Sequence, residues 1–89
     1  MKSYYDDQKI AAEKRINIIK GQIEALSKAI NNDKYCIDLL NQSLAIQNSL
    51  KSLDTLLLER HLKVHVPHQL HKEPAKAVKE IVELFKRRK

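Results

Sequence analysis

The stretch from Asp33 to Val66 contains no glycine and no proline, and Pro67 follows it directly. An uninterrupted segment of this length, rich in leucine and isoleucine, favours one long α-helix. The whole chain of 89 residues has one glycine and two prolines, which leaves little material for the turns and corners of a sheet. We therefore predict an all-α protein whose central helix runs over about residues 33–66 and ends at Pro67.

Apolar residues at three- and four-residue spacing predict two further helices, over about residues 8–30 and 74–88. Residues 1–7 are expected to be a short polar lead-in. The chain, residues 1–89, is then a three-helix chain that forms a single small domain. A chain this short buries only a thin core by itself, so oligomerisation is expected to contribute to its stability.

Residues suited to helix ends support these boundaries. Asp6 or Asp7 can cap the first helix, and Asp33 can cap the central one. Pro74 suits the first position of the last helix because that position needs no backbone N–H donor. Between Pro67 and Pro74, residues 68–72 are expected to form a polar link.

The central segment carries the only cysteine, Cys36, and two histidines one helical turn apart, His61 and His65. On a regular helix, at about 100° per residue, all three side chains point within about 20° of one direction. Along the axis, however, Cys36 and His61 are about 38 Å apart. Two antiparallel copies would bring each cysteine beside the histidines of the other copy. The spacing therefore predicts a dimer with a mixed sulfur–imidazole site at each end.

The apolar residues of the central helix cover an arc of about 200°, which is too wide for one partner helix to bury. At least two partners are needed, such as the first helix and a second chain. Gln47 and Asp54 also lie within this arc. We expect these two residues to set the register of the helices in a buried polar layer rather than to bind metal.

The formal net charge of +6 and the pI near 9.6 suggest an anionic partner, with nucleic acid as the first candidate. The alternative is a basic protein that is merely soluble. Residues 31–66 carry four basic and four acidic side chains, whereas residues 67–89 carry seven and three. The surplus positive charge therefore lies on the segments that flank a neutral central helix.

The lone cysteine fits the reducing cytosol, because it excludes an internal disulfide framework. Residues 1–9 are polar and acidic, unlike a secretory signal peptide. No apolar run approaches the roughly 20 residues that cross a bilayer. We therefore expect a cytoplasmic protein.

Three short motifs share one family pattern: Arg15 followed by Lys20-Gly21-Gln22, the run DKYCIDLL from Asp33 to Leu40, and His61-Leu62-x-x-His65. Together they resemble the CsoR/RcnR family of metal-sensing transcriptional repressors. The resemblance implies an antiparallel helical-hairpin dimer with a four-helix-bundle core, assembled as a dimer of dimers. It also implies that the metal-free tetramer binds operator DNA and releases it when a transition metal binds.

The same resemblance implies roles for individual residues. Cys36 of one subunit would bind metal together with His61 and His65 of its partner. Tyr35 and Glu80 match family positions that surround the metal-bound histidine and connect it to the last helix.

The DNA contact carried over from the family is Arg15. We add Lys14 and Lys20 as neighbouring DNA-contact candidates because of their charge and location. A solvated basic face is the alternative for all three.

The chain also departs from each branch of the family. Copper-responding members usually have a second cysteine where this chain has His65. Nickel- and cobalt-responding members share that histidine but add another near the N-terminus, where this chain has Ser3, Tyr4 and Tyr5. Formaldehyde-responding members have a proline at position 2, which here is Lys2.

One thiolate and two imidazoles satisfy Cu(I) in a trigonal site, whereas Ni(II), Co(II) and Zn(II) generally take four or more ligands. Those metals would have to recruit water, the N-terminus or His68. Both His68 and His71 lie outside the cysteine–histidine stripe and are expected to be solvent-exposed. The ligand set therefore favours Cu(I) over Ni(II)/Co(II).

These observations predict a metal-responsive repressor that binds double-stranded operator DNA, with Cu(I) as the preferred effector. A Ni(II)/Co(II)-responsive repressor and a formaldehyde-type sensor that uses Cys36 remain open. A cytosolic metal-storage or carrier protein would use the same ligands but ignore DNA. An enzyme is not expected, because the sequence has no glycine-rich phosphate loop and no nucleophile–base–acid set.

Overall fold

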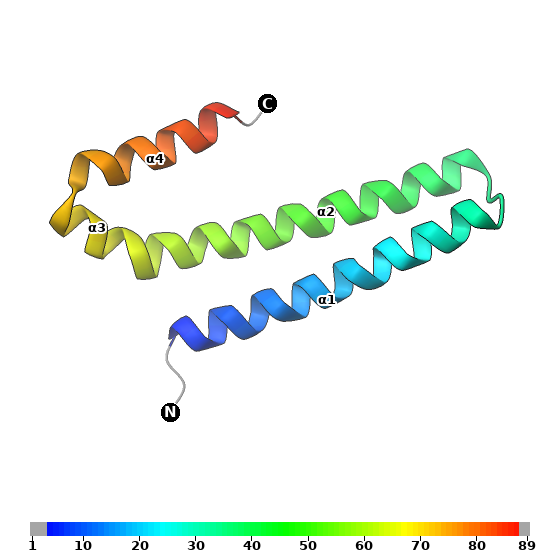
Figure 1. The fold of residues 1–89 in the computed structure, drawn as a ribbon, viewed down its shortest axis with the longest axis horizontal. Helices are drawn as coiled ribbons and strands as arrows, with labels where there is room; N and C mark the ends of the chain where they lie inside the picture. Colours follow the sequence, from blue (N-terminus) through cyan, green and yellow to red (C-terminus); the bar gives the residue numbers. More distant parts are fainter. Residues whose placement is uncertain (1–3, 88–89) are drawn as a thin grey trace. The chain divides into compact units, whose positions relative to one another are not determined.

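A computed structural model describes residues 4–87, and its side chains are described from residue 7 onward (Figure 1). The described residues form α1 (Tyr4–Asn31), α2 (Cys36–Arg60), the π-helical segment η1 (His61–His65), α3 (Val66–Lys72) and α4 (Pro74–Arg87), with no strand among them. The all-α prediction is therefore confirmed. Residues 1–3 of the predicted lead-in, which include Lys2 and Ser3, and residue 88 of the predicted last helix lie outside the described residues.

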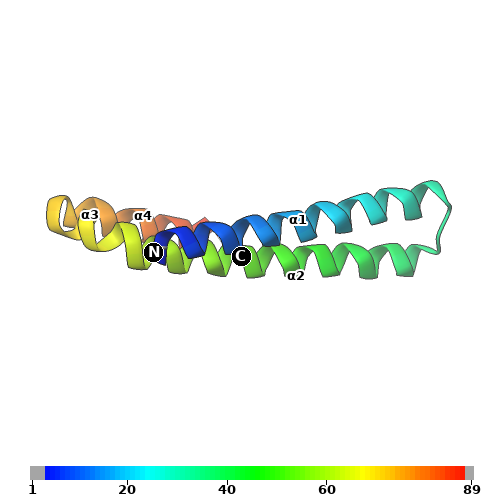
Figure 2. The ribbon, with the colours of Figure 1, turned by 90° about the horizontal axis from the view of Figure 1, so that it is seen from below.

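The chain divides into two compact units, residues up to Leu57 and residues from Leu58 onward. In the first unit, α1 and α2 lie side by side as an antiparallel hairpin (Figures 1 and 2). The hairpin core consists of apolar side chains from both helices: Ile19, Ile46 and Leu53, with Ala12, Ile16 and Leu26 packed against them. The apolar spacing that predicted the two helices thus also identifies the faces that meet.

α1 begins earlier than expected, at Tyr4, so the prediction of a lead-in over residues 4–7 is wrong. Asp6 and Asp7 lie within the first turn of α1 and do not precede it as caps. Acidic residues are favourable in a first turn because they interact with the positive end of the helix dipole. The same residue types therefore fit both positions, and the sequence alone does not separate them.

The turn between α1 and α2 depends on Asp33, which has a positive φ of 54°. Its N–H donates to the carbonyl oxygen of Ile30 at 3.1 Å, and the N–H of Lys34 donates to that of Ala29 at 3.1 Å. This pair of bonds satisfies the last carbonyls of α1. Asp33 thus ends α1, and the prediction that it caps the central helix is wrong.

In the second unit, the chain stays helical through Pro67, and the predicted helix end at this residue is wrong. A proline ring in a regular α-helix collides with the carbonyl four residues earlier. Here the N–H of Val66 donates to the carbonyl of His61, five residues back, so a wider π turn precedes the proline. Pro67 then occupies the first turn of α3, where its missing N–H costs nothing.

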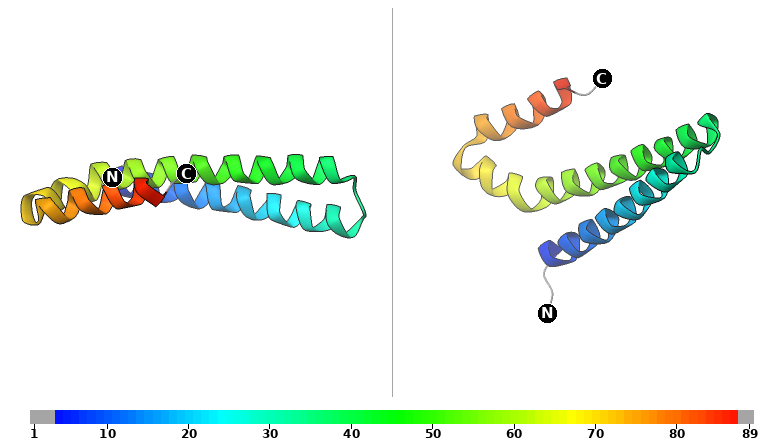
Figure 3. Two further views of the ribbon diagram at one scale, coloured as in Figure 1. Left: turned by 90° about the horizontal axis from the view of Figure 1, so that it is seen from above. Right: turned by 45° about the vertical axis from the view of Figure 1, so that its right-hand side comes forward.

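Residues 68–72, predicted as a polar link, form the body of α3. The helix stops at Glu73, whose backbone (φ −141°, ψ 69°) leaves the α-helical region, which is disfavoured for a residue before proline. Pro74 then takes the first position of α4, as predicted. Figure 3 shows α4 folding back after this break, and the unit buries Val66 and Ala77, the latter only 1% exposed.

Large apolar side chains remain exposed on every long helix. On α2, Leu40 is 63% exposed and Leu44 is 54% exposed, while Ile46 and Leu53 pack on α1. One half of the predicted apolar arc is therefore covered within the chain and the other half is not. None of the helices that the structure describes combines the length and the apolar character that a membrane crossing requires.

Candidate metal centre

His61 and His65 stand at the two ends of the π-helical segment η1. Their ring centroids are 5.8 Å apart and their planes are inclined by 33°. The His61 side chain is half-buried and that of His65 is exposed. The structure thus brings the two predicted histidines together, on an irregular turn of a kind that often occurs at functional sites.

The spacing of the two rings is compatible with one shared metal ion. A metal–nitrogen bond of about 2.0 Å places a metal about 3 Å from each ring centre, so two rings on one ion have centres no more than about 6 Å apart. The observed 5.8 Å lies within this limit. Two imidazoles leave at least one coordination position for a further donor.

Cys36 is the first residue of α2, and its thiol is free and exposed. The preceding residue, Tyr35, is 71% exposed, and its carbonyl accepts the N–H of Leu39 at 3.1 Å, which starts the helix. Since α2 has 25 residues, it extends about 37 Å from Cys36 to its end. Among the side chains that the structure describes, residues 7–87, no three histidine, cysteine or acidic groups lie together so that they could hold a metal ion.

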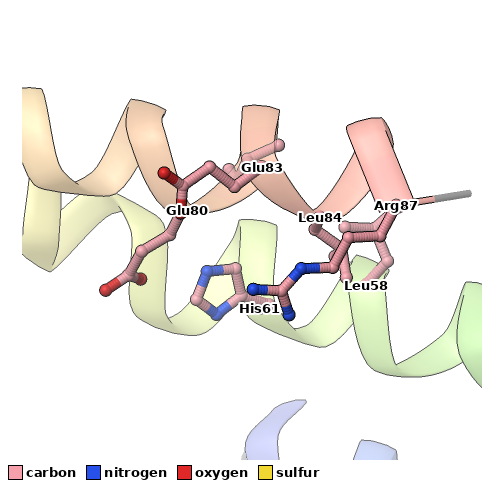
Figure 4. A pocket seen from close by; sticks show the side chains of 7 residues that line it. Leu58, His61, Glu80, Glu83, Leu84 and Arg87 are labelled. Atoms are coloured by element: carbon pink, nitrogen blue, oxygen red, sulfur yellow. The ribbon is translucent and has the colours of Figure 1, made fainter.

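The His61 side chain also lines a groove of about 400 Å³ within the second unit. Figure 4 shows its ring between the helical segment that bears it and α4. The other lining residues are Leu58, Glu80, Ile81, Glu83, Leu84 and Arg87. Glu80, the acidic residue that the family resemblance associates with the metal-bound histidine, therefore shares a groove with His61.

Glu83 and Arg87, which also line the groove, were not among the predicted site residues. Both follow Glu80 at helical spacing, three and seven residues later, so they lie on the same side of α4. The helical spacing from Glu80 is therefore the signal in the sequence that could have predicted Glu83 and Arg87. They add one acidic and one basic group to the wall of the groove beside His61.

The predicted DNA-contacting residues Lys14, Arg15 and Lys20 are all exposed on α1. They do not form one stripe, because the five residues from Arg15 to Lys20 turn the helix by about 140° after one full revolution. Gly21 directly follows Lys20, and a Cβ atom at this position would meet no other group within 4 Å. α1 therefore presents positive charge on more than one side.

The all-helical fold, the histidine pair and the lone thiol on the long helix define a small helical protein with a candidate metal site. The sequence profile of the metal-sensitive transcriptional repressor family matches residues 8–87, which is most of the chain. The chain belongs to this family, and the predicted resemblance to the CsoR/RcnR group is confirmed. Members of the family are transcriptional repressors, which agrees with the prediction that the chain is not an enzyme.

Individual relatives are copper sensors. The chain is 40% identical over 58 residues to the copper-sensing transcriptional repressor RicR of Mycobacterium tuberculosis, a match that covers 65% of this chain and 60% of RicR. It is 31% identical over 74 residues to the copper-sensing repressor CsoR of Bacillus subtilis, covering 82% of this chain and 73% of CsoR. Its fold is similar to the crystal structure of CsoR with Cu(I) from Geobacillus thermodenitrificans, with a TM-score of 0.82, 29% identity, and coverage of 97% of this chain and 91% of that one.

Proposed function

We propose that this protein is a Cu(I)-responsive transcriptional repressor, which binds operator DNA when metal-free and releases it when Cu(I) is bound. The observation that carries the proposal is the His61–His65 pair, whose 5.8 Å ring separation fits a shared metal, in a chain whose one thiol stands alone at the start of α2. Membership of the metal-sensitive repressor family supports the coupling of that site to DNA.

The ligands that we propose are Cys36 of one subunit with His61 and His65 of the partner subunit. No third ligand joins the histidines among the described residues of one chain, and α2 alone extends about 37 Å beyond Cys36. An antiparallel dimer solves this problem, since the first residue of each α2 then lies beside the far end of the other. The apolar face that α2 leaves exposed supports this pairing, and two such dimers form the proposed tetramer.

The donor set favours Cu(I) over Ni(II) and Co(II). A thiolate is a soft ligand that selects Cu(I), and three donors complete its coordination. Nickel and cobalt would need further ligands, for which His68 on α3 is the nearest candidate in sequence. The copper-sensing relatives RicR and CsoR support the same choice.

Positive charge supports the DNA-binding part of the proposal. A tetramer of chains that carry +6 each has a formal charge of about +24. Such a protein binds duplex DNA mainly through phosphates, with an affinity that falls steeply as salt increases. Lys14, Arg15 and Lys20, all exposed on α1, are the proposed contacts, and the protein would act in the cytoplasm, where the DNA is.

Release requires that the metal-bound and DNA-bound conformations differ. We propose that Glu80 holds the orientation of His61 through their shared groove, so that a change at the histidine is transmitted to α4. Tyr35 would contribute from the partner subunit, next to its Cys36. A coupling free energy of about 1 to 3 kcal/mol is typical of such systems, and metal and DNA then weaken each other's binding equally.

The proposal is tested by anaerobic titration of the reduced protein with Cu(I), Ni(II) and Co(II), in the presence of labelled duplex from the DNA upstream of its own gene. We expect about one Cu(I) per chain and loss of DNA binding as the site fills. DNA affinity that is unchanged at saturation with all three metals would refute it. Tight Cu(I) binding without any DNA binding would instead indicate a storage or carrier protein, and release by formaldehyde alone would indicate an aldehyde sensor.

A further inference from the structure

One face of α2 is exposed along its whole length within the hairpin. This pairing face consists of Cys36, Leu40, Leu44, Gln47, Leu50, Asp54 and Leu57, and all seven side chains are exposed. Four leucines give it the character of a surface that packs against protein. Gln47 and Asp54 are the polar exceptions near its middle, and polar groups in such a surface are costly unless each finds a partner.

The spacing of these residues is self-complementary for an antiparallel pair. Eleven residues separate Cys36 from Gln47, and eleven separate Asp54 from His65. Gln47 and Asp54 are seven residues apart on α2, about two helical turns, so they lie on the same side of that helix. Counted along the sequence, an antiparallel second copy that brings its Asp54 opposite Gln47 also brings its His65 to the level of Cys36.

We propose that Gln47 donates a hydrogen bond to the carboxylate of Asp54 in a second copy of this chain, and that this contact fixes the register of the dimer. Two-fold symmetry would form the contact twice, once on each side of the axis. In the single chain the Gln47 amide nitrogen donates to the hydroxyl of Ser43 at 3.3 Å. Because an amide nitrogen carries two hydrogens, a second donor remains for the carboxylate.

The alternative registers lack this match. A slip of seven residues in one direction would place Asp54 opposite Asp54, which sets two carboxylates against each other. The same slip in the other direction would place Asp54 opposite Leu40 and Gln47 opposite Gln47. A parallel dimer would also pair Asp54 with itself. Polar residues on an otherwise apolar helix face commonly select one register in this way.

The register matters for the proposed metal site, and the inference rests on the proposed function in this respect. A slip of seven residues would move Cys36 by about 10 Å relative to the partner's histidines, which is too far for a shared metal. Gln47 and Asp54 would thus act as positioning residues. They hold the thiol in place without binding the metal themselves.

Disulfide crosslinking of the full chain reads the register directly. In a Cys36→Ser background, single Leu50→Cys, Leu44→Cys and Leu57→Cys variants place a thiol at three similarly exposed positions of the pairing face. The proposed register puts the two copies of residue 50 beside the symmetry axis, but leaves the copies of residue 44, and those of residue 57, about 20 Å apart. We expect crosslinking of Leu50→Cys alone. Crosslinking at all three positions would indicate a parallel pair, and crosslinking at none of them another register; either result would overturn the inference.

A second experiment tests the contact itself. Gln47→Asp should place two carboxylates opposite each other and weaken Cu(I) binding by about 10- to 100-fold, the range for loss of residues that orient metal ligands. Asn48→Asp is the control, because it also replaces a side-chain amide with the carboxylate of aspartate, one residue away and about 100° around the helix. The exchange Gln47→Asp with Asp54→Gln rebuilds the pair with its members reversed, and should restore both Cu(I) affinity and Leu50→Cys crosslinking.

The two hypotheses fail differently. If Gln47→Asp behaves like Asn48→Asp, or the double exchange brings no rescue, the register contact is refuted while the repressor function stands. If the unmodified protein does not bind Cu(I) or does not release DNA, the proposed function is refuted. The crosslinking pattern still reports the register in that case, because it requires neither metal nor DNA.

Discussion

The α1–α2 hairpin and the unit from Leu58 onward are both helical, but they differ in regularity and in chemistry. The hairpin consists of two long α-helices with a thin aliphatic core and a largely apolar exposed face. The second unit contains a π turn, a proline within a helix, and a groove lined by His61, Glu80, Glu83 and Arg87. Under the proposed function, the regular part would serve assembly and the irregular part would supply the histidine ligands.

The largest expected effect is the loss of a metal ligand in the second unit. His61→Ala should lower Cu(I) affinity by more than about 100-fold, because it removes a ligand rather than an outer partner. DNA binding without metal should be retained. His68→Ala and His71→Ala are matched controls from the same unit, and Cu(I) titration should leave both near the unmodified value. An equal loss with His68→Ala would extend the site into α3.

The next effect concerns the hairpin and compares two leucines of α2. Leu53→Ala, in the core at 7% exposure, should lower the free energy of unfolding by about 2 to 5 kcal/mol. Leu44→Ala, on the pairing face, should chiefly weaken subunit association. Urea unfolding at several protein concentrations separates the two results. A loss with Leu44→Ala that does not depend on concentration would contradict the role of this face in assembly.

A smaller effect is expected within the groove beside His61. Glu80→Gln should weaken Cu(I)-dependent DNA release by about tenfold, at the lower end of the cost of losing a residue that orients a ligand. Metal-free DNA affinity should not change. Glu83→Gln removes the same charge from the same groove and serves as the control. If the two variants behave alike, the groove acts through its overall charge and not through a specific Glu80–His61 contact.

The smallest effect is at Gly21 on α1. A side chain there meets nothing within 4 Å in the chain, so Gly21→Ala should raise the free energy of unfolding by up to about 1 kcal/mol through helix propensity. Thermal unfolding of the metal-free protein measures this change in stability. Destabilisation would mean that a second molecule packs closely against this turn, and a selective loss of DNA affinity would identify DNA as that molecule.

Apolar periodicity predicted the hairpin well, because a two-helix core requires the same spacing that the sequence displays. Residue preferences at helix ends located the start of α4 at Pro74. The same preferences misassigned Asp33, because aspartate suits both a helix N-cap and a left-handed turn position. Only the backbone distinguishes these two uses.

The second unit was harder to predict for a different reason. Pro67 was predicted to end the central helix, but proline is tolerated in the first turn of a helix. The π turn before it could not be predicted, because no residue type is specific to such a turn. The pairing of His61 with His65 was still predicted, since four-residue spacing keeps two side chains close on either kind of turn. The position of Cys36 beside these histidines depends on a second chain and remains a prediction.

The most direct test of a metal site shared between subunits is a mixing experiment. Cys36→Ser chains and His61→Ala/His65→Ala chains should each fail to bind Cu(I) tightly when alone. After subunit exchange, a mixed dimer combines the intact cysteine of one chain with the intact histidines of the other, so tight Cu(I) binding should reappear at one site per mixed dimer. Mixtures that bind no more Cu(I) than the separate variants would contradict a site shared between subunits.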